Sequence, residues 1–218
     1  MIRIGSMKCT LREWQQLNKD SSTIIVQASP VDGSDSWQPF PIGFSYQFMT
    51  YRDEFIKSST GNHENTVLCC FIAQTDQHRR KRPAFNRQKV EYNLHKRGIY
   101  NYPFVRGLAY WSALKNSKFV ISPEGNGIDC HRHYEALMAG AIPVVEDNPL
   151  IKEKYSGCPI LYTKDYSEIS PKFLEKKYNE MIDQTYDFSR LFLAFYTEEQ
   201  QTQISECRDF WLKKLCNK

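Results

Sequence analysis

The chain has 218 residues, of which 41% are hydrophobic and 25% are charged, the composition of an ordinary globular protein. A chain of this length can bury one sizeable core without disulfides or metal ions. The formal net charge of +4 is too small for a general binder of nucleic acids or membranes, and we expect no nucleic-acid partner.

Targeting and membrane signals are missing from the pattern of the sequence. No run approaches the roughly 18 consecutive apolar residues of a transmembrane helix, and the start of the chain lacks the features of a signal peptide. The chain as given is therefore expected to be cytoplasmic. Its seven cysteines are odd in number and include no CxxC pair, which predicts reduced structural thiols and no metal site.

The first part of the chain contains few predicted elements. A helix is predicted over residues 10–18 and a strand over residues 23–27. Loop-forming residues follow, and Pro39 and Pro41 then favour an extended approach to Gly43.

From residue 66 onward, apolar runs alternate with helical periods. Residues 66–73 are continuously apolar, which predicts a strand buried on both faces. Further strands are predicted at 118–122, 141–145 and 160–162, and helices at 87–96, 107–116, 129–139 and over 171–215. This alternation indicates an α/β fold with a Rossmann-like parallel sheet and helices on both faces. Ligands bind such sheets beyond the carboxyl ends of the strands.

Residues 119–145 combine a strand, a glycine-rich turn, a helix and a second strand. Gly125 and Gly127 free the backbone to turn and let a bulky anion approach. Asp129 is predicted to cap the helix, and Gly140 to end it in a left-handed conformation. Since a helix start offers unpaired N–H groups and a partial positive charge, the segment favours phosphate binding.

The helix within this segment has two different sides. The residues expected to face the core are Cys130, Tyr134, Leu137 and Met138. The opposite side carries Arg132, Glu135, Ala136 and Ala139. There, an arginine in the first turn can reach an anion, and a carboxylate one turn later can accept hydrogen bonds from ribose hydroxyls. The pair therefore suits a nucleotide.

Other interpretations of the same residues remain open. Arg132 and Glu135 could form an ordinary surface ion pair at i,i+3 spacing. A P-loop is excluded because no Lys-Ser/Thr follows the glycines. The dinucleotide fingerprint fits in part, with Glu146 about 20 residues on, but Cys130 replaces its third glycine. A nicotinamide-dependent oxidoreductase is therefore an alternative.

Residues 119–145 also resemble the donor-binding segment of exostosin-like glycosyltransferases of the GT-B fold, in the pattern S-P-x-G-N-G-x-D-x-H-R-x-x-E-A. Weaker similarity covers residues 41–43, 66–82 and 160–169. The resemblance implies transfer of a sugar, perhaps xylose, from a nucleotide sugar, with UDP as the expected nucleotide. It also implies inversion at the sugar, a glycan or glycoprotein acceptor, and no essential metal or cofactor. If the chain is part of a longer protein, the Golgi lumen is the expected compartment.

The resemblance also assigns roles to individual residues. It places Arg132 on the diphosphate, Glu135 on the ribose, and Glu124 with Asn126 on the sugar or in shaping the loop that Gly125 and Gly127 form. Arg79 or Arg80, in a basic segment after the first strand of the sheet, would stabilise the leaving diphosphate.

One departure from the family concerns the acceptor side. A complete GT-B enzyme has two Rossmann-like domains, and here a small or truncated segment (1–65) precedes the expected nucleotide-sugar-binding domain (66–218). The general base, normally supplied from the acceptor side, has six candidates: His131, Asp129, Asp32, Asp35, Asp53 and His63. Trp37 is a candidate for contact with the acceptor. Alternatively, the chain is a non-catalytic nucleotide-sugar-binding module that needs a partner domain or a second copy.

Overall fold

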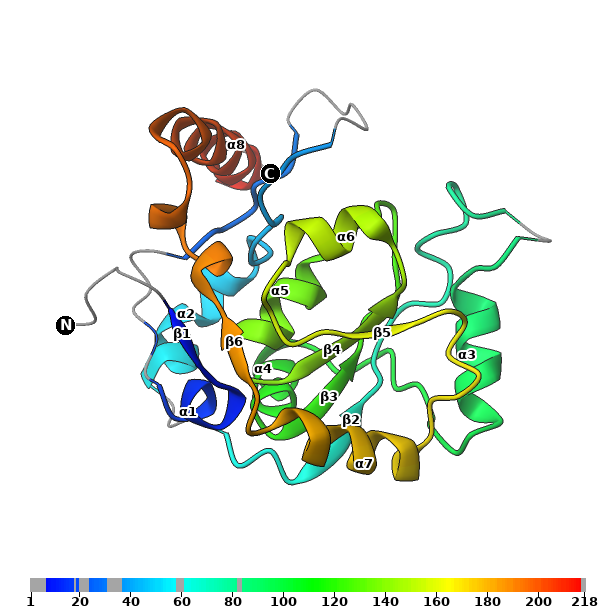
Figure 1. The fold of residues 1–218 in the computed structure, drawn as a ribbon. Coiled ribbons are helices and arrows are strands. Elements are labelled where there is room, and N and C mark those ends of the chain that lie inside the picture. Colours follow the sequence, from blue (N-terminus) through cyan, green and yellow to red (C-terminus); the bar gives the residue numbers. More distant parts are fainter. Residues whose placement is uncertain are drawn as a thin grey trace.

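The centre of the protein is a four-stranded parallel sheet, seen in a computed structural model that describes residues 7–17, 19, 24–30, 37–57, 61–81 and 84–216 (Figure 1). The strand order is β2 (Asn65–Leu68), β3 (Ser117–Ile121), β4 (Ile142–Glu146) and β5 (Leu161–Thr163). In register, Phe119 pairs with Val67 on one side and with Ile142 on the other. The expected α/β fold with a Rossmann-like parallel sheet is confirmed.

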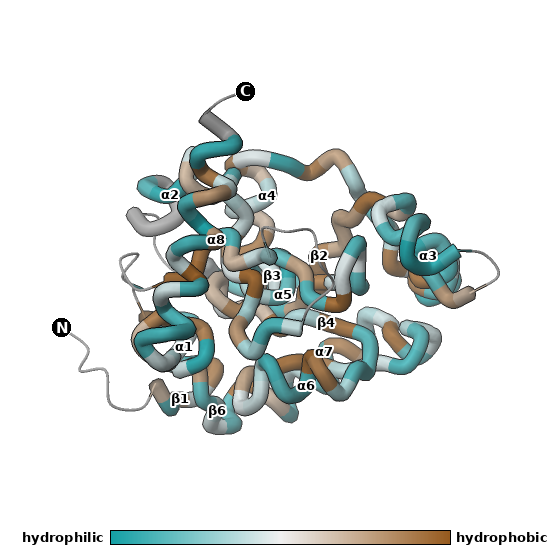
Figure 2. Tube along the Cα trace, turned by 90° about the horizontal axis from the view of Figure 1, so that it is seen from above, coloured by the Kyte–Doolittle hydropathy of each residue, from teal (hydrophilic) through white to brown (hydrophobic). Residues whose placement is uncertain are grey.

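Helices surround this sheet, and a small antiparallel pair lies beside it (Figure 1). The pair is β1 (Lys8–Thr10) with β6 (Thr185–Asp187). The helices are α1 (Leu11–Gln16), α2 (Phe48–Lys57), α3 (Arg87–His95), α4 (Gly107–Lys115), α5 (His131–Met138), α6 (Pro149–Lys154), α7 (Pro171–Met181) and α8 (Glu198–Cys216). Helices α4 and α5 contact β3 and β4, and α7 contacts β2. Figure 2 shows the outer helix α3 as largely hydrophilic.

Local signals explain where several helices begin and end. Asn86 and Ser170 accept hydrogen bonds from backbone N–H groups in the first turns of α3 and α7. Thr10 and Glu13 form a reciprocal capping box at α1. After α5, Gly140 adopts a φ of +81°, as the C-terminal signal predicted.

The prediction of a long strand over residues 66–73, buried on both faces, is wrong, because β2 is shorter and more exposed. It ends at Leu68 and is only half-buried, whereas β3 and β4 are almost entirely buried. The reason is topology: β2 is an edge strand of the sheet, and the chain leaves it before Cys69, Cys70 and Phe71. These three residues are still buried, but outside the strand ladder.

Two further predictions about elements are wrong. Residues 24–27 are not a strand but form isolated bridges, Ile24 with Phe192 and Val26 with Phe44. Residues 171–215 are not helical throughout, because β6 and two short 3₁₀ turns separate α7 from α8. Both results depend on pairing between segments far apart in the chain.

The N-terminal segment packs into the same hydrophobic core as the sheet. The ring of Trp14 stacks on Phe188 at 4.0 Å, and its Nε1 donates to the carbonyl of Leu137 at 2.7 Å. Helix α8 reaches the same region, where Trp211 Nε1 donates to the carbonyl of Ser29. The division into 1–65 and 66–218 stays a prediction.

Within the described ranges, no helix has the length and apolar character needed to cross a bilayer. The compartment of the protein stays a prediction.

Candidate active site

A cavity of about 450 Å³ lies beyond the carboxyl ends of β2 and β3. Its walls come from five segments: Ser45 before α2, Cys70 after β2, Arg87 at the start of α3, Arg106 at the start of α4, and the first turns of α5. The volume falls in the range of small-molecule sites, and the place is the one where parallel sheets bind ligands.

Helix α5 begins at this cavity with a different cap from the one predicted. Cys130, not Asp129, is the N-cap residue, and it makes no side-chain capping bond. Both Cys130 and the first helical residue, His131, line the cavity. The positive end of the helix dipole therefore lies at the cavity wall without a side-chain acceptor of its own.

Arg132 brings a charged guanidinium to the cavity. One Nη donates to the carbonyl of Cys70 at 2.9 Å, while the buried Nε has no hydrogen-bond partner in the part of the chain that the structure describes. Burial alone would lower the pKa of Arg132, but nearby Tyr110, Cys70 and Glu135 leave it raised. The side chain is therefore a fixed positive charge with hydrogen-bonding capacity to spare.

Glu135 brings a carboxylate to the cavity. Its Oε2 accepts from Tyr110 Oη at 2.6 Å, and its Oε1 from the backbone N–H of Ser45 at 3.4 Å. Burial, and then the carboxylate, raise the pKa of Tyr110, which keeps it a donor. Because Glu135 is only 4% exposed, the interpretation as a surface ion pair with Arg132 is wrong.

His131 is held in one tautomer by the linker before α2. Its Nδ1 lies 2.8 Å from the carbonyl oxygen of Gly43, and since a carbonyl can only accept, Nδ1 carries the hydrogen in this contact. In the neutral ring, Nε2 then carries a lone pair. His131 lines the cavity, and its role as a general base stays a prediction.

Asp129, the other candidate base in this segment, is surrounded by hydrogen-bond donors of the protein itself. Its carboxylate accepts from the N–H of Ile42 at 3.0 Å, from Lys154 Nζ at 2.9 Å and from Tyr155 Oη at 2.8 Å. Burial alone would raise the pKa of Asp129, but Lys154 and these hydrogen bonds leave it lowered. A carboxylate so well stabilised is a poor proton acceptor, so the geometry favours His131 over Asp129 as the base.

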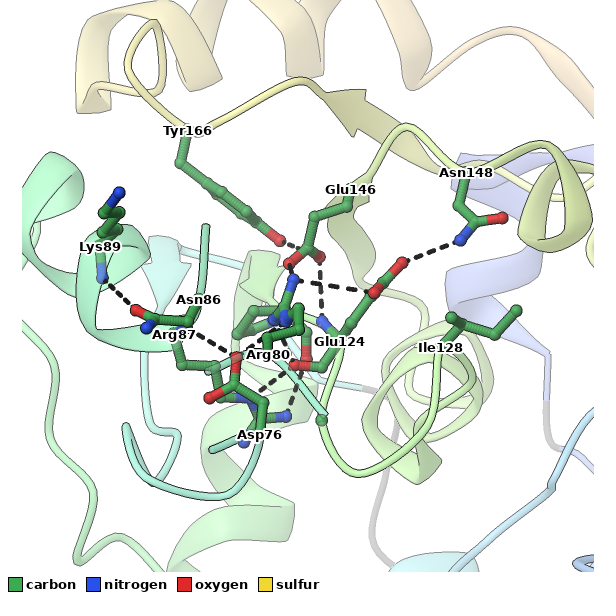
Figure 3. A network of polar contacts seen from close by, with 12 residues as sticks. Asp76, Arg80, Asn86, Arg87, Lys89, Glu124, Ile128, Glu146, Asn148 and Tyr166 are labelled. Carbon is green, nitrogen blue, oxygen red and sulfur yellow. Dashed lines mark hydrogen bonds and ion pairs between the residues drawn. The ribbon is translucent and has the colours of Figure 1, made fainter. Parts of the chain in front are cut away.

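A largely buried charge network lies beside the cavity, at the carboxyl ends of β2, β3 and β4 (Figure 3). Its charged members balance, three arginines against three acidic residues: Arg79, Arg80, Arg87, Asp76, Glu124 and Glu146. Arg80 bonds to Asp76 at 2.8 Å and to Glu146 at 2.9 Å, and Arg79 bonds to Glu124 at 2.6 Å. The charges of Arg79 and Arg80 are thus compensated within the protein.

The glycine-rich turn is shaped by this network. A Cβ on Gly125 would lie 2.9 Å from an Nη of Arg87, so the missing side chain makes room for a guanidinium. Arg87 donates hydrogen bonds to the carbonyls of Pro123 and Glu124, and these bonds hold the backbone of the turn in place. Asn126 and Gly127 are exposed at its tip. Their roles toward a donor sugar, like that of Glu124, stay predictions.

The remaining candidate bases lie away from the cavity or outside the described residues. His63 is buried with its Nδ1 2.9 Å from the carbonyl of Ser117, at the amino end of β3. Asp53 is exposed on α2. Asp32 and Asp35 fall outside the described residues. The Trp37 ring lies 4.2 Å from Lys154 Nζ, and its role toward the acceptor stays a prediction.

Comparisons with known proteins match the segment that carries Arg132 and Glu135. Residues 106–207 match the family described as the RXYLT1 C-terminal domain. Over 102 residues the chain is 30% identical to human ribitol-5-phosphate xylosyltransferase 1, covering 40% of this chain and 23% of that protein. The zebrafish (Danio rerio) protein of the same name is 35% identical over 80 residues, covering 31% and 18%.

The chain is similar to glycosyltransferases. This similarity confirms the coarser part of the prediction from residues 119–145. The aligned parts span less than a quarter of the length of these relatives. The matched segment includes Tyr110, His131, Arg132 and Glu135. Asp76 and the three arginines of the charge network lie outside it.

Proposed function

We propose that the protein is an inverting glycosyltransferase of the exostosin-like GT-B type that uses a UDP-sugar. The observation that carries this proposal is the cavity that Arg132, His131 and Glu135 line together. All three residues belong to the segment similar to glycosyltransferases. Xylose is the proposed sugar, because the relatives are named xylosyltransferases. The proposed acceptor is a hydroxyl of a glycan or glycoprotein, and the relatives' name suggests a ribitol phosphate as one such group.

The donor nucleotide would bind along α5. Arg132 and the helix start hold the diphosphate, because both present N–H donors and positive charge to the cavity. Glu135 accepts hydrogen bonds from the ribose hydroxyls, since each of its oxygens keeps a further lone pair beside the bonds from Tyr110 and Ser45.

The chemistry would be a single displacement. The acceptor hydroxyl attacks the anomeric carbon of the sugar, its proton passes to Nε2 of His131, and the bond between that carbon and the diphosphate breaks with the electron pair on the diphosphate. Arg132 and the α5 start stabilise the departing charge, which is why the proposal needs no metal. Arg79 and Arg80 have a secondary role, since their charges are already paired.

The second candidate is a nucleotide-sugar-binding module that works only with a partner domain or a second copy. It is favoured by one observation: the two side chains proposed to hold the donor, Arg132 and Glu135, both lie on α5, inside the matched segment. Turnover separates the two functions: a binding module holds the donor but neither hydrolyses nor transfers the sugar with any acceptor.

The experiment that tests the proposal is a thermal-shift and calorimetric panel of UDP, GDP, CMP, ADP and NAD, with and without divalent metal. Selective stabilisation by UDP in the absence of metal supports the donor site. Stabilisation by NAD alone favours the oxidoreductase alternative. If no nucleotide binds, the proposed donor site is wrong for this chain as it stands.

A further inference from the structure

We propose that the start of α4, together with Arg106, forms a second half of the diphosphate site, facing the half that α5 and Arg132 provide. The proposal deepens the proposed function and rests on it. It assigns the cavity to a nucleoside diphosphate held between two helix starts. One phosphate would bind at each helix.

The first observation is that two helices begin at the same cavity. Arg106 and Gly107 line it from α4, and Cys130 and His131 line it from α5. The N-cap residues of both helices, Arg106 and Cys130, make no side-chain capping bond. Two sets of first-turn N–H groups therefore surround one space without a side-chain acceptor, and two helix dipoles favour negative charge there.

The second observation concerns unused donors on arginine side chains. Arg106 is exposed at the cavity, and the described part of the chain provides no hydrogen bond or ion pair to its guanidinium. Arg132 keeps a buried Nε without a partner within the same described ranges. Arg87 also lines the cavity, but its guanidinium is occupied by backbone carbonyls. Of the described arginines that line the cavity, Arg106 and Arg132 thus keep N–H groups available to an anion.

Gly107 keeps the α4 side of the cavity open. It has a φ of +58°, which favours glycine, and a Cβ there would lie 3.1 Å from Tyr51 Oη, on the cavity wall. One turn later, Tyr110 on the same helix holds the Glu135 carboxylate. Helix α4 therefore supplies positive charge at its start and, further along, binds the only carboxylate among the described residues lining the cavity.

The test compares ligands that differ in one phosphate. Titration calorimetry would measure UDP, UMP and inorganic pyrophosphate against the unmodified chain, Arg106→Ala, Arg106→Lys and, as a matched control, Arg97→Ala, which removes an exposed arginine that does not line the cavity. We expect the unmodified chain to bind UDP roughly tenfold or more tightly than UMP, the effect of a charge-assisted hydrogen bond. In Arg106→Ala, this preference should fall to about threefold or less, with Arg106→Lys intermediate and Arg97→Ala unchanged.

The outcomes separate this inference from the proposed function. An unchanged preference for UDP over UMP in Arg106→Ala overturns the role of α4 and leaves the donor site standing. Binding of pyrophosphate without any nucleotide, weakened in Arg106→Ala, supports the anion site but overturns the proposed donor. If neither pyrophosphate nor a nucleotide binds, both are wrong.

Discussion

At the scale of single residues, the contact between His131 and Gly43 decides which ring nitrogen can act as a base. A carbonyl 2.8 Å from Nδ1 fixes the hydrogen there and leaves Nε2 as the acceptor. The sequence motif placed a histidine beside an arginine, but the tautomer depends on a linker residue far away in the chain.

The first prediction replaces His131 by asparagine, whose side-chain amide can still donate to Gly43. The turnover number for transfer of the sugar from a UDP-sugar should fall by roughly 100-fold or more, the usual effect of losing a general base. The affinity for UDP should stay within about threefold of that of the unmodified chain. Steady-state kinetics and calorimetry measure the two quantities. His95→Asn, at an exposed histidine on α3, is the control. Loss of UDP affinity with intact turnover would assign His131 to binding.

The second prediction concerns Arg132→Ala. Because Arg132 lines the cavity and its buried Nε has no hydrogen-bond partner among the described residues, its loss should weaken UDP binding by about 1–3 kcal/mol. Calorimetry measures the change, and Arg12→Ala, which removes an exposed arginine paired with Asp183, is the control. Equal UDP affinity in Arg132→Ala and the unmodified chain would show that the donor is not held by α5.

At the scale of elements, the position of α5 is set by the residues at its C-terminal end as well as by those at its start. Gly140 leaves the helix with a φ of +81° and packs against Gln15 from α1. The turn was predictable, because a glycine after the last apolar position is a local signal. The close approach of α1 was not.

The third prediction compares two glycines with nearly the same backbone. Gly140 and Gly98 have φ values of +81° and +80°, but a Cβ on Gly140 would lie 2.9 Å from Gln15 Cγ, and one on Gly98 meets nothing within 4 Å. Gly98→Ala should lower the free energy of unfolding by about 1–2 kcal/mol through backbone strain alone, and Gly140→Ala by about 1 kcal/mol more. Urea denaturation measures both. Equal losses would mean that the packing against α1 relaxes at no cost.

At the scale of the whole molecule, Asp129 joins three parts of the chain. It accepts hydrogen bonds from the linker at Ile42 and from Lys154 and Tyr155 around α6, while it precedes α5. The Lys154 side chain is only 5% exposed, so the ion pair is buried. The segment before α2 and helix α6 are thereby both tied to the residue that leads into α5.

The fourth prediction is that Asp129→Asn lowers the free energy of unfolding by about 3 kcal/mol or more at pH 7, because it leaves a buried lysine without its counterion. Since the folded pKa of Asp129 is lowered, the stability it contributes is complete above its ordinary value of 3.8 and is lost as the pH falls through the lowered pKa. The unmodified chain should therefore lose more stability than Asp129→Asn between pH 5 and 3.

Urea denaturation across this pH range measures the effect. Asp183→Asn is the matched control, because Asp183 pairs with Arg12 at the exposed surface, where solvent screens the ion pair, and its loss should change the stability little. A variant Asp129→Asn with the same acid dependence as the unmodified chain would contradict the assignment.

The local course of the chain was determined by the sequence alone, since helices α3, α4 and α5 and strands β3 and β4 lie within a few residues of their predicted bounds. Caps, glycines and apolar periods act over a few residues, so they can be recognised without the fold. They also place Arg132 and Glu135 one turn apart at the carboxyl end of a strand.

The partners of these residues were decided by the tertiary structure. Tyr110 reaches Glu135, Arg87 fills the space beside Gly125, and Arg80 is neutralised by Asp76 and its acidic neighbours. No spacing rule relates residues that meet only after the sheet has formed. Burial makes each such pairing obligatory, because an uncompensated charge or polar group in the interior costs several kcal/mol. The sequence alone thus predicted where a ligand could bind, and packing decided which side chains remain free for the proposed ligand.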